Sequence, residues 1–245
     1  MSTVDAKCKF RNGVYYFDEY GESPIWDITL TNAEPFIPLD IKEIDCILPN
    51  PYEQGSLIVA SDRYYYSDKN PFEALQKYAA DYSFADYTVM SSCLRSFGSF
   101  GGYKSPWLNP FFALCPLEGI SNTLWINPLR IHELEYYEGQ LFATFHSGQI
   151  ICLPIQLRSA MQRIDVTCLA FATLRRECFY FTNRGDRPSH YLPISDSPFS
   201  NKLAKRPLLE HFSIPYGKLT KRYNEALLFH SYAQLEYDML QKDLF

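Results

Sequence analysis

The chain has 245 residues, of which 47% are hydrophobic and 16% aromatic, enough to fill the core of one large domain or two small ones. Its 19 Tyr and 18 Phe are spread among short segments interrupted by 16 Pro, a composition that favours a β-rich fold over long amphipathic helices. The first residues lack the apolar core of a signal peptide, and the longest apolar runs fall far short of a membrane span. We therefore expect a cytoplasmic protein with no membrane partner.

The formal net charge of −5 is distributed unevenly along the chain. Residues 1–90 contain 7 Lys or Arg against 15 Asp or Glu, whereas residues 155–222 contain 12 against 5, a net charge of +7. Because salt screens charges beyond about 8 Å, a basic segment can bind a polyanion while the acidic part stays clear of it. On charge alone, an equal alternative is that the basic segment pairs with the acidic part of the same chain.

The acidic first third predicts short strands over residues 14–17, 25–30 and 57–66, separated by turn signals such as Asn50-Pro51. One helix is predicted after them, over residues 71–82. Its signals are an Asn cap, a Pro at the first helical position, a Glu at the third, and apolar residues at helical spacing: Asn70, Pro71, Glu73, Phe72, Leu75, Tyr78, Ala79 and Tyr82.

Glycines and aromatic residues alternate in residues 91–106, and we expect a tight loop or a bulged strand there, since no G-K-[ST] follows to make a phosphate loop. The pattern is clearest over residues 125–155, where Glu138-Gly139 and Ser147-Gly148 divide three alternating segments into a β-meander. In its middle strand one set of side chains can pack while the other faces solvent: Leu141, Ala143 and Phe145 against Phe142, Thr144 and His146.

After the meander, apolar spacing predicts a short helix over residues 157–164 that carries Arg158 and Arg163 on its outer face. A further strand is expected over residues 166–173. A Pro- and Ser-rich exposed loop follows over residues 184–200.

The chain ends in a helix predicted over residues 220–244, long enough to pack against the body or to form an oligomer contact. The predicted fold class is therefore α+β and β-rich: an antiparallel meander or sandwich with a few short helices and a long C-terminal helix.

Several segments, in order, resemble the core of ComK, the bacterial competence transcription factor. They are Ser92-Cys93-Leu94-Arg95, Phe97-Gly98-Ser99, Pro116, Trp125-Ile126, FATFHSGQIICLPI (residues 142–155) and ATLRREC (residues 172–178). The resemblance covers roughly residues 55–240, and the helix-to-strand order after Leu153 is similar to LytTR-type DNA-binding domains. It implies an acidic extension over 1–54, a ComK-like DNA-binding domain over 55–218, and a C-terminal helix over 219–245.

The resemblance also implies a function: a transcription activator that binds AT-rich double-stranded DNA as a homo-oligomer and controls competence and DNA-uptake genes. Phe212 and Pro215 resemble the family's motif for an adaptor of a Clp protease, with one residue fewer between them.

Six arginines between residues 158 and 187 supply the side chains that DNA binding needs, because guanidinium groups stay charged and are attracted to a narrow AT-rich minor groove. Arg175 and Arg176 are the first candidates for DNA contact, with the remaining four as phosphate ligands: Arg158, Arg163, Arg184 and Arg187. Arg95 and Lys104 are weaker candidates.

Two other classes of protein remain open. An enzyme could use Cys93, beside Ser91 and Ser92, as a thiol nucleophile, but no peptidase or hydrolase signature surrounds it, so we expect no catalytic site. A protein-interaction module could instead use the acidic residues and the final helix, with the basic segment paired internally. The seven cysteines form no C-x-x-C pair, so we expect reduced thiols, no metal and no cofactor.

Overall fold

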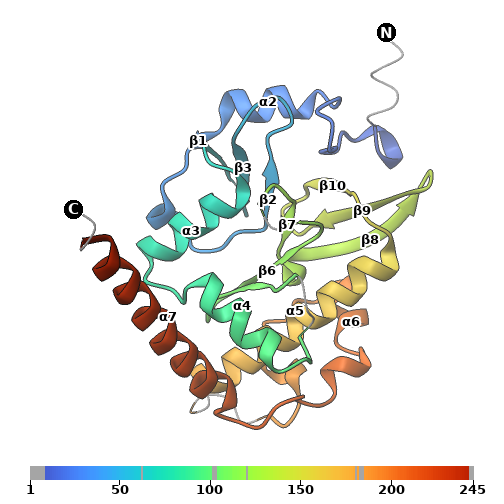
Figure 1. Cartoon of the computed structure of the whole chain (residues 1–245). Coiled ribbons are helices and arrows are strands. Elements are labelled where there is room, and N and C mark those ends of the chain that lie inside the picture. The colour runs from blue at the N-terminus through green and yellow to red at the C-terminus, as the bar shows by residue number, and fades with distance from the viewer. Residues whose placement is uncertain are drawn as a thin grey trace.

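The computed structural model describes residues 9–61, 63–100, 104–119, 121–179, 181 and 185–242. It confirms the α+β class, with 43% helix and 20% strand. Helices lie against two sheets, and the longest helix lies at the edge of the molecule (Figure 1).

The larger sheet has seven strands in the order β1-β4-β3-β2-β7-β6-β5. All its neighbours are antiparallel except β1 and β4. The strands are β1 Glu34–Pro35, β2 Cys46–Pro49, β3 Ser56–Ala60, β4 Arg63–Ser67, β5 Trp107–Leu108, β6 Ala113–Pro116 and β7 Trp125–Ile126. Because β2 pairs with both β3 and β7, the boundary predicted after residue 54 falls inside the β2–β3 hairpin.

The smaller sheet is the predicted meander, formed by β8 Ile131–Tyr137, β9 Gln140–Phe145 and β10 Ile150–Leu153. Its inward side chains, Leu141, Ala143 and Phe145, belong to the main core. The other face is partly covered as well, since Phe142 packs with Phe10, Tyr16 and Ile150 of a small separate cluster. Residues 125–126, expected to begin the meander, form β7 of the larger sheet instead.

Six α-helices lie within the described residues: α2 Ile25–Asn32, α3 Pro71–Asp81, α4 Tyr87–Ser96, α5 Leu157–Cys178, α6 Pro198–Leu203 and α7 Lys218–Lys242. Short 3-10 turns complete them: η1 Arg11–Gly13, η2 Pro38–Asp40, η3 Pro128–Arg130, η4 Pro188–Tyr191 and η5 Pro207–Leu209. The predicted helix at residues 71–82 is confirmed as α3, and Asn70 and Glu73 form the expected capping box at its start.

Besides residues 125–126, several segments differ from the sequence predictions. The single strand predicted over residues 57–66 is the antiparallel pair β3 and β4. Residues 25–30 form α2 instead of a strand, and residues 14–17 contribute isolated bridges to Lys9 and Ile151. The stretch predicted as a loop or bulged strand begins inside α4, which Asp86 caps by accepting a hydrogen bond from Val89 N–H. Residues 166–173 continue the helix α5, because burial of residues 167–173 on all sides removes the polar face that marks a helix in sequence.

The core lies in two parts on either side of the larger sheet. The main part lies between the two sheets and α5, whose Leu169, Ala170 and Phe171 are fully buried. The second part lies between α3 and the larger sheet, where Tyr78 packs against Trp107. Burial of this many large side chains holds α5 rigidly against both sheets.

A buried carboxylate connects the two sheets. Asp45, fully buried beside the start of β2, accepts a hydrogen bond from Arg130 Nε at 2.7 Å and from Ser147 Oγ at 2.9 Å. Arg130 ends η3, and Ser147 lies in the turn between β9 and β10. Asp45 therefore ties the larger sheet to the meander by one ion pair and one hydrogen bond, and Gln149 Nε2 adds another by donating to the Tyr64 hydroxyl at 3.0 Å.

Candidate nucleic-acid interface

Arg175, near the end of α5, is bound by the protein itself. Its Nε donates to the carbonyl of Tyr191 at 2.6 Å, and its Nη1 donates to the carbonyl of Pro110 at 2.7 Å. The guanidinium also lies 4.8 Å from the ring centre of Phe179, and burial lowers the pKa of Arg175. The side chain thus fastens two loops to α5.

Arg176 has a similar environment. Its Nη2 donates to the carbonyl of Ile214 at 2.9 Å, its guanidinium lies 3.7 Å from the ring centre of Phe212, and burial lowers its pKa. Contact with DNA by Arg175 or Arg176 would compete with these hydrogen bonds and ring contacts. The structure therefore places the two first-choice candidates in internal contacts.

The proposed adaptor motif is divided between two environments. Phe212 is half-buried between Arg176 and Tyr191, whose ring centre lies 5.6 Å away in an edge-to-face contact. Pro215 is exposed. An adaptor could reach Pro215 directly, whereas Phe212 would first have to leave its contact with Arg176.

The remaining predicted arginines do not gather in one place. Arg158 is exposed in the first turn of α5, and Arg163 donates from Nη1 to the carbonyl of Pro116 at 3.1 Å. Arg187 is exposed just before η4, which packs against the other end of α5. Arg184 lies outside the described residues. At 1.5 Å per residue, Arg158 and Arg175 are separated by roughly 26 Å along the helix.

A different group of cations surrounds the start of α5. Lys202, Lys205 and Arg206, from α6 and the segment after it, line a cavity of about 430 Å³ together with Leu157 and Met161 of α5 and one acidic residue, Glu133 of β8. We call these three cations, together with Arg158, which follows Leu157 in the first turn of α5, the basic face. Three of them, Lys202, Lys205 and Arg206, belong to the basic segment of residues 155–222, but the predicted site did not include them.

The members of the basic face differ in their pairing. Arg206 binds Asp165 of α5 with Nε at 3.0 and 2.9 Å from the two carboxylate oxygens and with Nη2 on one of them, and these hydrogen bonds raise its pKa. Arg158, Lys202 and Lys205 are exposed and form no ion pair within the part of the chain that the structure describes. Three charges on this face are therefore available to an anion.

Two more cations, Lys104 and Arg163, lie close to each other. Burial lowers the pKa of Lys104, and the nearby positive charge of Arg163 lowers it further, whereas the negative charge of Glu118 acts in the opposite direction. This second group of positive charge is therefore partly compensated.

The basic segment and the acidic segment are not joined by ion pairs in the residues that the structure describes. Within residues 155–222, Arg206 pairs with Asp165 and Arg222 with Glu225. The cations in residues 9–90 that form ion pairs bind Glu135, Glu34 and Asp68. The internal pairing required by the interaction-module alternative is absent from these ranges.

Cys93, the residue suggested as a thiol nucleophile, is buried in α4. Its Sγ lies 3.8 Å from the carbonyl oxygen of Leu219, and burial raises its pKa to about 11. A thiol with that pKa stays protonated at neutral pH, whereas a nucleophilic cysteine needs its thiolate. Among the described residues, no three His, Cys, Asp or Glu side chains are grouped as a metal site.

Comparison with known proteins identifies no relative: no protein-family model, no curated protein and no solved structure matches the chain. Over the described ranges, none of the helices combines the length and apolar character needed to cross a membrane.

Proposed function

We propose that the chain is a DNA-binding transcription regulator of the ComK type, a non-enzymatic cytoplasmic activator that binds AT-rich promoter DNA and controls competence and DNA-uptake genes. Two independent lines support the proposal: the order of ComK-like motifs in the sequence, and an exposed basic face at the start of α5. The basic face is the observation that carries it.

The basic face suits a phosphate backbone. Arg158, Lys202 and Lys205 are exposed and unpaired within the described residues, so their binding to DNA would not require a protein ion pair to break. The first turn of α5 contains no acidic residue, so the positive end of the helix dipole adds to their field. Lysine and arginine charges of this kind position a duplex through its phosphates, while Arg158 can enter a narrow AT-rich minor groove.

The test compares two double variants of the full chain. We expect Arg158→Ala/Lys205→Ala to weaken binding to an AT-rich duplex and to reduce the slope of log affinity against log salt concentration by up to about 2, because two phosphate contacts are lost. The matched control is Arg63→Ala/Lys42→Ala, which removes one exposed Arg and one exposed Lys from the acidic part.

Electrophoretic shift or fluorescence anisotropy across a salt series gives both quantities. If the folded basic-face variant bound DNA with the same affinity and salt slope as the wild type, the basic face would not contact DNA. Binding of AT-rich and GC-rich duplexes with equal affinity would contradict the AT preference. If the wild type bound neither DNA nor heparin at low salt, the interaction-module alternative would be favoured instead.

A further inference from the structure

The cavity at the start of α5 has an apolar wall. It lies between β8, α5 and α6, and its volume is about 430 Å³. Four side chains form the wall, of which the last is buried and the others are within reach of solvent: Leu134, Leu157, Met161 and Phe199. Apolar surface inside a cavity favours an apolar ligand, because binding removes that surface from water. We call this space the α5–α6 cavity.

Cations border the apolar wall. Lys202 and Lys205 are exposed and form no ion pair within the described part of the chain, whereas Arg206 is held by Asp165. Glu133 of β8 is the one carboxylate among the described residues that line the cavity. Two free ammonium groups against one carboxylate favour an anionic group over a cationic one in this place.

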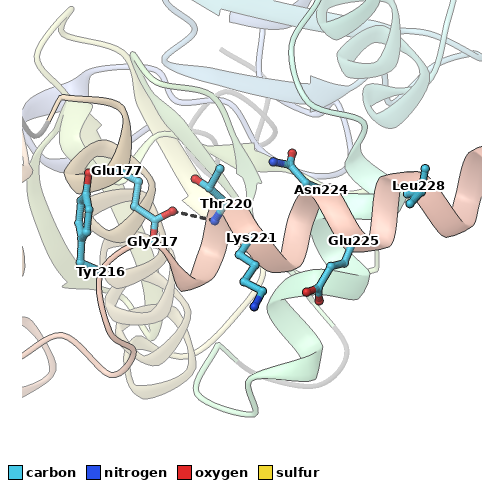
Figure 2. Close-up of a pocket in the computed structure, with 8 residues that line it drawn as sticks. All are labelled: Glu177, Tyr216, Gly217, Thr220, Lys221, Asn224, Glu225 and Leu228. Atoms are coloured by element: carbon cyan, nitrogen blue, oxygen red, sulfur yellow. Dashed lines mark hydrogen bonds between the residues drawn. The ribbon is translucent and has the colours of Figure 1, made fainter.

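The groove beside the start of α7, of about 700 Å³, has the opposite balance of charge. Its lining includes Glu177 and Glu225 against Lys221 (Figure 2). Glu177 accepts hydrogen bonds from the backbone N–H groups of Leu219 and Thr220, and Glu225 pairs with Arg222 of the same helix. Both carboxylates are therefore already bound by the protein, and the α5–α6 cavity is the better candidate for a charged ligand.

The size of the α5–α6 cavity decides what kind of ligand it can take. Its volume of about 430 Å³ lies in the range of small-molecule sites, roughly 300–1,000 Å³. A protein partner would cover about 800 Å² of surface on each side, far more than a cavity of this size provides. Met161 adds adaptability, since its unbranched thioether can follow the shape of a bound apolar chain.

We propose that the α5–α6 cavity binds a small anionic amphiphile, a carboxylate carried on an apolar chain. The chain lies against the apolar wall, and the carboxylate accepts hydrogen bonds from the ammonium groups of Lys202 and Lys205. The negative charge of Glu133 keeps the carboxylate on the side of the two lysines.

Methyl NMR of the full chain, labelled with ¹³C at its methionine methyl groups, gives a reporter inside the cavity. The probe is octanoate, which we expect to shift the Met161 signal with a dissociation constant on the order of 1 mM. Met90 and Met239 do not line the cavity, so their signals serve as internal controls. Met161→Leu assigns the reporter signal.

A series of head groups tests the charge requirement. We expect 1-octanol and octyltrimethylammonium, which share the chain but are neutral and cationic, to bind at least about fivefold more weakly than octanoate. Acetate, which has the head group without the chain, should leave the Met161 signal unchanged. Lys202→Ala/Lys205→Ala should abolish the preference for octanoate over 1-octanol, and Lys42→Ala/Lys218→Ala, two exposed lysines outside the cavity, should retain it.

Two leucines of similar exposure test the apolar wall. Leu157, in the wall, is 37% exposed, and Leu227, on α7, is 38% exposed. We expect Leu157→Gln to weaken octanoate and 1-octanol binding alike, and Leu227→Gln to change neither. The signal of the buried Met90 shows that each variant is folded.

Three outcomes would overturn the proposal: no Met161 shift up to about 5 mM octanoate, equal affinity for octanoate and octyltrimethylammonium, or an unchanged preference in the Lys202→Ala/Lys205→Ala protein. Parallel titration of the Met239 and Met161 signals would show non-specific binding and would also overturn it. If the chain binds DNA as proposed above, the ligand and DNA compete for the two lysines. Ligand binding is measured without DNA, so the two proposals can fail independently.

Discussion

Arginine side chains on α5 differ in role according to what surrounds them. Arg158 is exposed at the start of the helix, whereas Arg175 and Arg176 at its end donate to carbonyl groups and lie against aromatic rings. A sequence pattern records only that these residues are cationic. Their hydrogen-bond partners lie at Pro110, Tyr191 and Ile214, distant in sequence, and decide which charge is available to DNA.

The first residue-scale prediction concerns Arg176. We expect Arg176→Ala to lower the free energy of unfolding by about 2 kcal/mol, since it removes a charged hydrogen bond and a cation–π contact with Phe212. Arg176→Lys should recover little of this, because an ammonium cannot stack on the ring as a guanidinium does. Urea unfolding gives the values, with the exposed Arg187→Ala as the control.

DNA affinity distinguishes this structural role from a role in binding. We expect the folded Arg176→Ala protein to bind an AT-rich duplex within about twofold of the wild type and with the same salt slope. If Arg176→Ala left the stability unchanged but reduced the salt slope of DNA binding, Arg176 would be assigned to the DNA contact.

At the scale of elements, α7 depends on a residue outside itself. Its first backbone N–H groups have no partner within the helix, and the Glu177 carboxylate of α5 accepts two of them. Because the same carboxylate opposes the positive end of the α7 dipole, it stabilises the helix by charge as well as by hydrogen bonding. Glu177 therefore acts as an N-cap supplied from another helix.

We expect Glu177→Gln to lower the free energy of unfolding by about 1 kcal/mol, since glutamine keeps the shape but loses the charge and one acceptor oxygen. Hydrogen exchange at Leu219 and Thr220 should accelerate more than exchange in α5. Glu225→Gln is the control, because Glu225 lines the same groove but forms only a surface ion pair with Arg222 at 3.3 Å. Equal losses in the two variants would rule out the capping role.

Local signals explain which elements could be predicted from sequence. The α3 helix and the meander from residue 131 onward were predicted correctly because Asn70, Glu73 and the Gly-containing turns act on their immediate neighbours. The second half of α5 was predicted as a strand because its burial on all sides is a tertiary property. The candidate site could not be predicted for the same reason. Lys202 and Lys205 lie beside α5 only because residues 188–207 fold back against that helix.

At the scale of the whole molecule, Asp45 joins two sheets that otherwise contact each other mainly through apolar side chains. Its carboxylate is fully buried, and its partners Arg130 and Ser147 belong to different connections. Loss of one member of a buried pair leaves the other charge uncompensated. The two sheets are therefore expected to unfold together in the wild type.

We expect Asp45→Ala to lower the free energy of unfolding by about 3 kcal/mol, reduced from a fully buried pair because Arg130 retains some exposure. The neighbouring Glu43→Gln is the control. Burial raises the pKa of Glu43 in the folded protein above its unfolded value of about 4.3. The contribution of Glu43 to stability is therefore lost as pH rises from the unfolded pKa through the folded pKa, because the buried side chain becomes charged.

We therefore expect the Glu43→Gln protein to be at least as stable as the wild type at neutral pH. Denaturation followed by tryptophan fluorescence gives the free energy of unfolding of each protein. An Asp45→Ala protein as stable as the wild type would show that apolar packing alone couples the sheets.

The first described residues complete the meander from the opposite end of the sequence. Phe17 pairs with Ile151, its N–H donating to the carbonyl of Ile150 at 2.9 Å and its carbonyl accepting from Cys152 N–H at 2.9 Å. Because synthesis proceeds at 5–20 residues per second, Phe17 is made roughly ten seconds before β10, the strand with which it pairs. Asp18 and Glu19, directly after it, place two negative charges beside this apolar stretch, and charges in such a position oppose aggregation of an unpaired strand.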